Sequence, residues 1–309
     1  MNLRKNFFVL PVVSAGVIAV SLAISSCAVL TKSQLDTVTK LTVASDTVAA
    51  SPQKLFADLA TIRFERGLYF AASLTSAEGR EREINALANA LISDEGSAKK
   101  AEVYVNVLNS YLRALRSVSA DARWKASGTE WRGIGRNIDS LILRLNQTEI
   151  LGTPITVGWA KLSGQYMGYM SERYVRLRQA KAVRMFVTQG DTLVSSCVDG
   201  LIDLLKKGDL IDLIENESEG LRSNYRMYLH RLELSEFPPD FDADRNYIEM
   251  IKKMELVKYT RGRCVTALQA LRRAHTKLVV ALEKRQKIDF LFDELIELNT
   301  LALQLNSNL

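Results

Sequence analysis

Residues 247–282 read YIEMIKKMELVKYTRGRCVTALQALRRAHTKLVVAL, the most regular stretch of the chain. Steps of three and four residues connect one series of positions, which places them on one face of a helix about 54 Å long at 1.5 Å per residue. The series is Tyr247, Met250, Met254, Val257, Arg261, Cys264, Leu268, Leu271, His275, Leu278 and Leu282. This spacing predicts a coiled-coil-like seam. Arg261 and His275 hold two of its positions, where a polar group costs stability but fixes register or marks a contact.

Helical patterns extend over the rest of the chain, and no stretch alternates in the manner of a β-strand. The other predicted helices cover residues 33–50, 52–74, 79–92, 104–118, 138–145, 156–188, 192–206, 210–234 and 288–305. The sequence LGTP at residues 151–154 is the strongest break in the middle of the chain. It divides the chain into helical regions 34–150 and 155–309. We therefore expect an all-α protein, an elongated multi-helix bundle with coiled-coil-like long helices.

Three shorter breaks set the expected ends of individual helices. Ser51 and Pro52 are typical of a helix start, with an N-cap serine followed by proline at the first helical position. Residues 207–209 read KGD, which predicts a C-terminal glycine followed by a capping aspartate. The segment SEFPPDFDAD at residues 235–244 ends a helix, because consecutive prolines cannot continue one.

The amino terminus has the composition of a targeting segment. Arg4 and Lys5 are followed by an uncharged run from Phe7 to Ile24. A basic start, a short apolar run and small residues at its exit are typical of a secretory signal peptide. The alternative is a signal anchor, but the run is near the lower length limit for a spanning helix, and Pro11 and Gly16 weaken it.

The exit of this run reads Ile24-Ser25-Ser26-Cys27 and resembles the lipobox of bacterial lipoproteins. The resemblance implies that residues 1–26 are cleaved, that a diacylglycerol is attached to the Cys27 sulfur, and that residues 27–33 form a lipidated tether. Two or three acyl chains hold a protein on a bilayer for long periods, since each buried methylene contributes about 0.8 kcal/mol. Ala28 stands where enterobacterial lipoproteins of the inner membrane have aspartate. The expected location is therefore the periplasmic face of the outer membrane, with the inner membrane as the alternative.

Composition limits the classes of partner. Cleavage before Cys27 leaves 283 of the 309 residues and lowers the formal net charge from +6 to +4. This length allows a sizeable core, and so small a charge in the periplasm gives no reason to expect nucleic acid as a partner. Cys197 and Cys264 are the remaining cysteines. They form either a disulfide, which an oxidising compartment permits, or two small buried hydrophobic residues.

Two sequences match the S-x-x-K spacing of penicillin-binding enzymes, at residues 51–54 and 97–100. The KTG and SDN motifs that accompany this spacing are absent from the chain, and helix starts explain both sequences. No HExxH, Cys-His cluster, G-x-S-x-G or glycine-rich phosphate loop occurs either. We therefore expect no enzymatic activity, no cofactor and no metal.

A D-x-D-x-D sequence at residues 240–244 has the form of the opening of a calcium loop. An EF-hand also needs glycine at its sixth position and glutamate at its twelfth, where this chain has Arg245 and Ile251. Capping of the long helix that follows, by Asp242 or Asp244, is the better explanation of these carboxylates.

Two further features are candidates for interaction. Gly164 and Gly168 have the small-xxx-small spacing that lets two helices approach closely. They lie in residues 150–170, which could form either a membrane-active hairpin or a buried helix after a turn. Arg173 and Arg176 begin a basic run that could meet anionic lipid headgroups or an acidic partner; the alternative is an ordinary solvated helix face.

These features favour a lipid-anchored periplasmic protein that works by binding. We expect a scaffold or accessory subunit of an envelope assembly, such as a secretion apparatus. It would be anchored in the membrane by a lipid on Cys27, and it would bind partner proteins, or a second copy of itself, through its helical seams. One alternative is a membrane-active protein resembling helical pore formers, which would use residues 150–170. A second alternative is an enzyme or ligand carrier whose site is assembled from scattered residues.

Overall fold

The seam predicted for residues 247–282 lies on one uninterrupted helix, α9 (Phe241–Glu283). Nine of its eleven residues are buried, and Tyr247 and Arg261 are partly buried. Helix α9 packs against helices α2, α7 and α10 of the same chain. The predicted seam is therefore confirmed, and it closes within one molecule.

The computed structural model describes residues 30–93, 97–120, 128–147, 154–155, 157–164, 172–284 and 292–307, and within these ranges it contains nine helices and no strand. The other eight helices are α2 (Lys32–Ser73), α3 (Ala77–Ser93), α4 (Ser97–Ser119), α5 (Gly128–Gln147), α6 (Trp159–Gly164), α7 (Glu172–Lys206), α8 (Gly208–Leu234) and α10 (Phe292–Ser307). The predicted all-α multi-helix bundle is confirmed.

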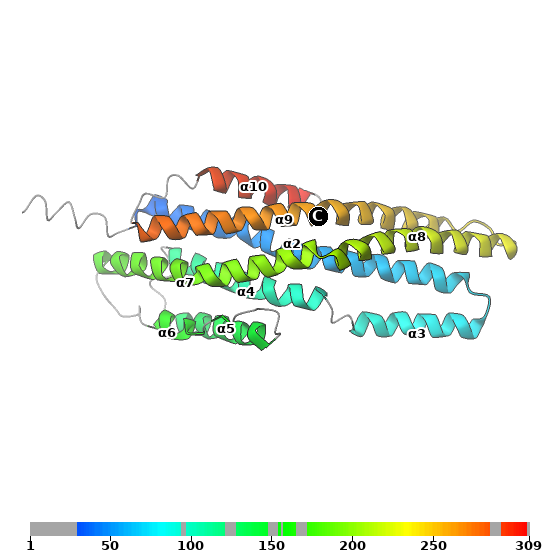
Figure 1. Ribbon diagram of the computed structural model, residues 1–309, viewed down its shortest axis with the longest axis horizontal. Helices are drawn as coiled ribbons and strands as arrows, with labels where there is room; N and C mark the ends of the chain where they lie inside the picture. Colours follow the sequence, from blue (N-terminus) through cyan, green and yellow to red (C-terminus); the bar gives the residue numbers. More distant parts are fainter. Residues whose placement is uncertain are drawn as a thin grey trace, which may run out of the picture.

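The long helices run lengthwise and give the molecule an elongated shape (Figure 1). Helix α2 is central, because it packs against α3, α4, α8, α9 and α10. Helices α7 and α8 follow one another along the same direction, and α9 returns beside them. Buried side chains from both the region 34–150 and the region 155–309 belong to one hydrophobic cluster. This shared core positions the turn between α8 and α9 at one end of the bundle (Figure 1).

The predicted helix start at Ser51 and Pro52 is wrong, because α2 continues through both residues. Pro52 cannot donate a hydrogen bond to the carbonyl of Val48, and the Ser51 hydroxyl donates to the Thr47 carbonyl at 2.8 Å. Val48 and Leu55 on either side of the proline are buried. Packing on both sides therefore outweighs the missing backbone bond.

The predicted break between residues 188 and 192 is also wrong. Helix α7 passes through Gly190 without interruption. A glycine inside a helix is unfavourable by itself, but Gly190 lies against the ring of Tyr111 on α4. The glycine allows two helices to approach closely and does not end one of them.

Three helix caps differ from expectation or were not predicted. Helix α2 begins with a capping box, in which Thr31 and Gln34 exchange hydrogen bonds between side chain and backbone. Helix α8 follows Lys207, which makes no side-chain cap, so Asp209 lies in the first turn and is not the predicted cap. Helix α9 is capped by Asp240, whose carboxylate accepts from two backbone N–H groups at 3.1 and 3.2 Å. The predicted caps Asp242 and Asp244 are wrong, because both lie inside the first turn of α9, after Asp240.

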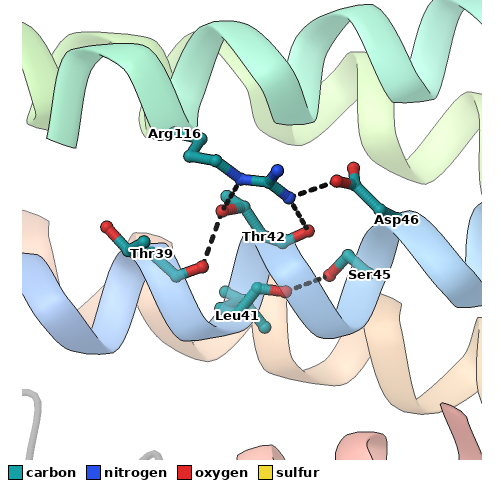
Figure 2. Close-up of polar contacts among 6 residues, drawn as sticks. All are labelled: Thr39, Leu41, Thr42, Ser45, Asp46 and Arg116. Atoms are coloured by element: carbon teal, nitrogen blue, oxygen red, sulfur yellow. Dashed lines mark hydrogen bonds and ion pairs between the residues drawn. The ribbon is translucent and has the colours of Figure 1, made fainter. Parts of the chain in front are cut away.

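A polar contact joins α4 to the first half of α2 (Figure 2). The Arg116 guanidinium donates to the Thr42 hydroxyl at 3.3 Å and to the Thr42 carbonyl at 3.2 Å, and it forms an ion pair with Asp46. The buried hydroxyls of Thr42 and Ser45 donate to carbonyls of the preceding turn, at 2.8 and 2.6 Å. These hydroxyls are thus satisfied within α2, and Arg116 fixes the position of α4 along it.

None of the helices in the described ranges is both long and apolar enough to span a bilayer.

Candidate functional site

Helices α8 and α9 form a hairpin. One motif in its turn ends α8, and another begins α9. Glu236 N–H donates to the Glu233 carbonyl, and Phe237 N–H donates to the Leu232 carbonyl, each at 3.2 Å. This pair of bonds is a Schellman motif, and it places Glu236 in the left-handed region with φ of 54°. Two prolines then prevent a further helical turn, and Asp240 caps α9. We call residues 231–242 the hairpin tip.

Large apolar side chains are exposed at the hairpin tip. Leu234 and Phe237 are each 66% exposed and Phe241 is 74% exposed. A shallow depression of about 600 Å³ lies between Phe237 and Phe241. It is lined by Tyr228, Leu232, Phe237, Pro238, Pro239, Asp240, Phe241 and Asp242. An apolar surface rimmed by polar side chains is typical of a site for interaction with another molecule.

A cluster of tyrosines forms a firm base beneath the tip. Tyr225 stacks on Tyr247 with ring centroids 3.8 Å apart and planes 6° from parallel. Tyr69, at the end of α2, donates its hydroxyl to the Ala243 carbonyl at 2.8 Å and packs edge-on against both rings. Three helices are therefore tied together immediately behind the exposed residues.

Asp240 in the tip and Asp244 just after it already accept hydrogen bonds from tyrosines of this base. Tyr228 donates its hydroxyl to Asp240 at 3.1 Å, and Tyr225 donates to Asp244. Hydrogen bonds from the Ala243 N–H, from Tyr228 and from the Asp242 N–H hold the pKa of Asp240 below its usual value. Burial, aided by the nearby carboxylates, raises the pKa of Tyr228 to about 12. The tyrosine remains a donor and the aspartate an acceptor at neutral pH.

The hairpin tip is acidic, although the whole chain carries a formal charge of +6. Residues 231–242 contain a single basic residue, Arg231. It is outnumbered by four carboxylates, those of Glu233, Glu236, Asp240 and Asp242. The apolar surface therefore has a negative rim.

Several of the site residues predicted from sequence lie outside the described structure, wholly or in their side chains. Cys27 and Gly168 lie outside the described residues, and Gly164 is the last residue of α6. Arg173 and Arg176 lie in the first turns of α7, and their side chains are outside the described part of the structure.

Arg261 and His275 on the α9 seam bond to neighbouring helices of the same chain. Arg261 donates to the Leu205 carbonyl at the end of α7 at 3.2 Å. His275 is buried between the Tyr111 hydroxyl, 2.7 Å from its Nε2, and the Asp191 carboxylate, 3.2 Å from its Nδ1. These contacts join α9 to α7 and α4.

The chain of groups Tyr111–His275–Asp191 has the components of a proton relay. The Asp191 carboxylate accepts from Nδ1–H, which leaves Nε2 of the neutral ring to accept from the Tyr111 hydroxyl. Tyr111 is completely buried beneath Trp159 and His275, and burial raises its pKa well above the usual value. The Tyr111 hydroxyl is closed to solvent, and its bond to His275 joins α4 to α9 inside the core.

Cys197 and Cys264 are free thiols, both buried. Burial raises the pKa of Cys264 to about 12 and that of Cys197 further. Of the two alternatives for these cysteines, the structure supports two small buried side chains and contains no disulfide between them.

The three aspartates of the D-x-D-x-D sequence serve other purposes. Asp240 caps α9, Asp242 pairs with Arg245, and Asp244 accepts from Tyr225. No group of three or more His, Cys, Asp or Glu side chains is placed to hold a metal ion within the described ranges.

The exposed apolar residues of the hairpin tip were not predicted from the sequence, in which residues 235–244 were interpreted as a helix stop followed by capping aspartates. Leu234, Phe237 and Phe241 give no periodic signal, because they lie at or beyond helix ends. Two phenylalanines around a proline pair, Phe237 and Phe241, are the one feature that could have been noticed. Comparison with known proteins identifies no relative: no family model, no curated protein and no solved structure matches this chain.

Proposed function

We propose that this chain is a lipid-anchored scaffold of the bacterial envelope that binds a partner protein through its hairpin tip. The observation that carries the proposal is the exposure of Leu234, Phe237 and Phe241 on a rigid tyrosine base. Burying one such side chain in a complex contributes about 1.5–3 kcal/mol. Exposed aromatic side chains near the centre of a contact often dominate its energy.

The arrangement of α2 suits a protein held at one end. Its 42 residues make a helix about 63 Å long at 1.5 Å per residue. It begins after Thr31, and Tyr69 near its other end bonds to the first turn of α9. A lipid on Cys27, at the periplasmic face of the outer membrane, would therefore leave the hairpin tip about 60 Å from the point of attachment.

Binding fits the described chemistry better than catalysis does. The Tyr111–His275–Asp191 chain is closed to solvent at Tyr111, and the tip carboxylates of Asp240 and Asp242 have partners within the hairpin. The proposed role is that of an accessory subunit of an envelope assembly, such as a secretion apparatus, which presents the tip to another component.

The anchor is tested by labelling cells with palmitate. We expect label in the wild-type protein and none in a Cys27→Ala variant, which lacks the sulfur that would carry the lipid. Label that persists in the variant would contradict lipidation at Cys27.

The tip is tested by photo-cross-linking in intact cells that produce the full chain. A benzoylphenylalanine at position 237 or 241 should give an adduct with another protein. The matched control is position 303 on α10, because Leu303 is an apolar residue of similar exposure, 68%. Equal adducts from all three positions, or adducts from position 303 alone, would reject the tip as the binding surface.

A further inference from the structure

We infer that the partner docks on the hairpin tip with a basic segment that inserts a large apolar side chain into the depression. This inference rests on the proposed function and adds the chemistry of the partner. It follows from the shape of the depression, the charge around it and one unfavourable backbone conformation.

The depression suits a large apolar side chain from a segment of the partner protein. Its walls are the rings of Phe237 and Phe241 and the proline pair between them. Proline and aromatic side chains have few rotatable bonds, so little conformational entropy is lost when they become buried. The depression is open to solvent over much of its extent, so it can receive a side chain of a partner but does not enclose a whole small ligand.

The rim of the depression favours a positively charged partner. Glu233 and Asp242 are exposed and make only weak surface pairs, with His230 at 3.4 Å and Arg245 at 3.1 Å. Within the described part of the chain, no cation lies at ion-pair distance from Glu236. Lysine or arginine side chains of a partner would be attracted to these carboxylates and would increase the rate of association.

The same rim disfavours a membrane as the occupant. Exposed phenylalanine and leucine side chains can insert into a lipid interface, but anionic headgroups repel a surface with four carboxylates and one arginine. A protein segment that combines apolar and basic residues satisfies both parts of the surface.

Glu236 supports a role for negative charge at this position. It is the only non-glycine residue with positive φ in the described ranges, and it occupies the C′ position where glycine is the usual residue. Fold stability alone would favour glycine there. The glutamate places an exposed carboxylate beside Phe237 at the expense of a strained backbone.

The test combines mapping of the adduct with charge variants. The probe is benzoylphenylalanine at position 241, and the partner segment joined to it is identified by mass spectrometry. We expect a segment rich in lysine or arginine that also contains large apolar residues. An acidic or uncharged segment, a lipid adduct, or an adduct with a second copy of this chain would overturn the inference while leaving a contact at the tip.

Charge variants separate attraction from folding. Glu236→Lys should lower the adduct yield about fivefold or more, since an exposed ion pair contributes up to about a factor of five and reversal adds repulsion. Glu219→Lys, a charge reversal at an exposed position on α8 outside the tip, is the control and should change the yield little. Glu236→Gly should also lower the yield although it relaxes the backbone, which a purely structural role for Glu236 does not predict. Equal yields from Glu236→Lys and Glu219→Lys would refute the inference; loss of every adduct at positions 237 and 241 would refute the proposed function itself.

Discussion

Gly190 on α7 lies so close to Tyr111 on α4 that a Cβ on the glycine would stand 2.3 Å from Cε2 of the ring. A second pair repeats this relationship, because a Cβ on Gly200 would stand 2.3 Å from Cζ of Tyr104. Both tyrosines are fully buried. The distance between α4 and α7 is therefore set by two glycines on one helix and two tyrosines on the other.

Gly190→Ala should destabilise the protein by about 1–3 kcal/mol, because the buried ring of Tyr111 has no open space to move into. The free energy of unfolding in urea measures this change. Gly262→Ala is the matched control: Gly262 also lies inside a helix, and a Cβ there meets nothing within 4 Å. The control should raise the free energy of unfolding by about 0.5–1 kcal/mol. Stabilisation by both variants would contradict the close contact.

Tyr111→Phe should cost about 1–3 kcal/mol, because it leaves the buried Nε2 of His275 without its hydrogen-bond donor. The ring itself is retained, so packing against Trp159 changes little. Tyr104→Phe is the comparison, since that tyrosine is equally buried and lies on the same helix but does not contact the histidine. Equal losses in the two variants would show that the bond to His275 adds nothing specific.

The Asp191 carboxylate should make stability depend on pH in the acid range. The hydrogen bond from His275, opposed by partial burial and helped by the charge of Arg272, lowers the pKa of Asp191 below its usual 3.8. A carboxylate with a lowered native pKa contributes stability that is present above the unfolded-state pKa and is lost as pH falls through the native value. The difference in unfolding free energy between wild type and Asp191→Asn should therefore narrow as the pH is taken from 5 to 3, values chosen around the usual pKa of about 4. A difference that widens over this interval would contradict the assignment.

Arg116→Ala should lower the free energy of unfolding by about 1–2 kcal/mol, because it removes the bonds to Thr42 and the ion pair with Asp46 together (Figure 2). Added salt should reduce the loss only in part, since the bonds to Thr42 are not ion pairs. The control is Arg113→Ala on the same helix, at an exposed position. Its effect should stay within about 0.5 kcal/mol, as for most surface substitutions.

Glu236→Gly should stabilise the protein by about 0.5–1 kcal/mol, because glycine adopts positive φ without the steric conflict of a Cβ. Glu236→Ala separates the backbone from the charge, since alanine removes the carboxylate but keeps the Cβ. It should give no gain. Thermal unfolding of the three proteins side by side measures the difference, and an equal rise in Tm for both variants would attribute the effect to charge.

The parts of the fold that could be predicted from the sequence are the helices whose buried residues recur at regular intervals. Met250, Met254 and Val257 on α9 repeat at three and four residues and are buried as predicted. Packing inside the chain requires a continuous apolar face, and such a face appears in the sequence as spacing.

The residues that mislead are those whose local preference is overruled by neighbours distant in sequence. Pro52 and Gly190 have the signature of helix ends, yet both lie inside long helices. Buried side chains surround the proline, and Tyr111 needs the space left by the glycine. Neither reason is visible within a window of neighbouring residues.

The candidate site could not be predicted for a different reason. Phe237 and Phe241 differ from core phenylalanines only in their surroundings, which the sequence does not contain. Tyr111, Asp191 and His275 are likewise separated by 80 residues or more, and only the packing of α4, α7 and α9 brings them together. A site whose residues are brought together by helix packing leaves no motif in neighbouring positions of the sequence.

The unbroken course of α2 has a mechanical consequence. A pulling force applied between Thr31 and the base of the hairpin tip would run along the axis of this single helix. Helices α4, α8 and α9 lie alongside α2, so their contacts with it would be loaded in shear and would share the force. Contacts that are loaded together resist more tension than contacts that are peeled apart one after another. The bundle is thus suited to bear tension along its length, between Thr31 and the hairpin tip.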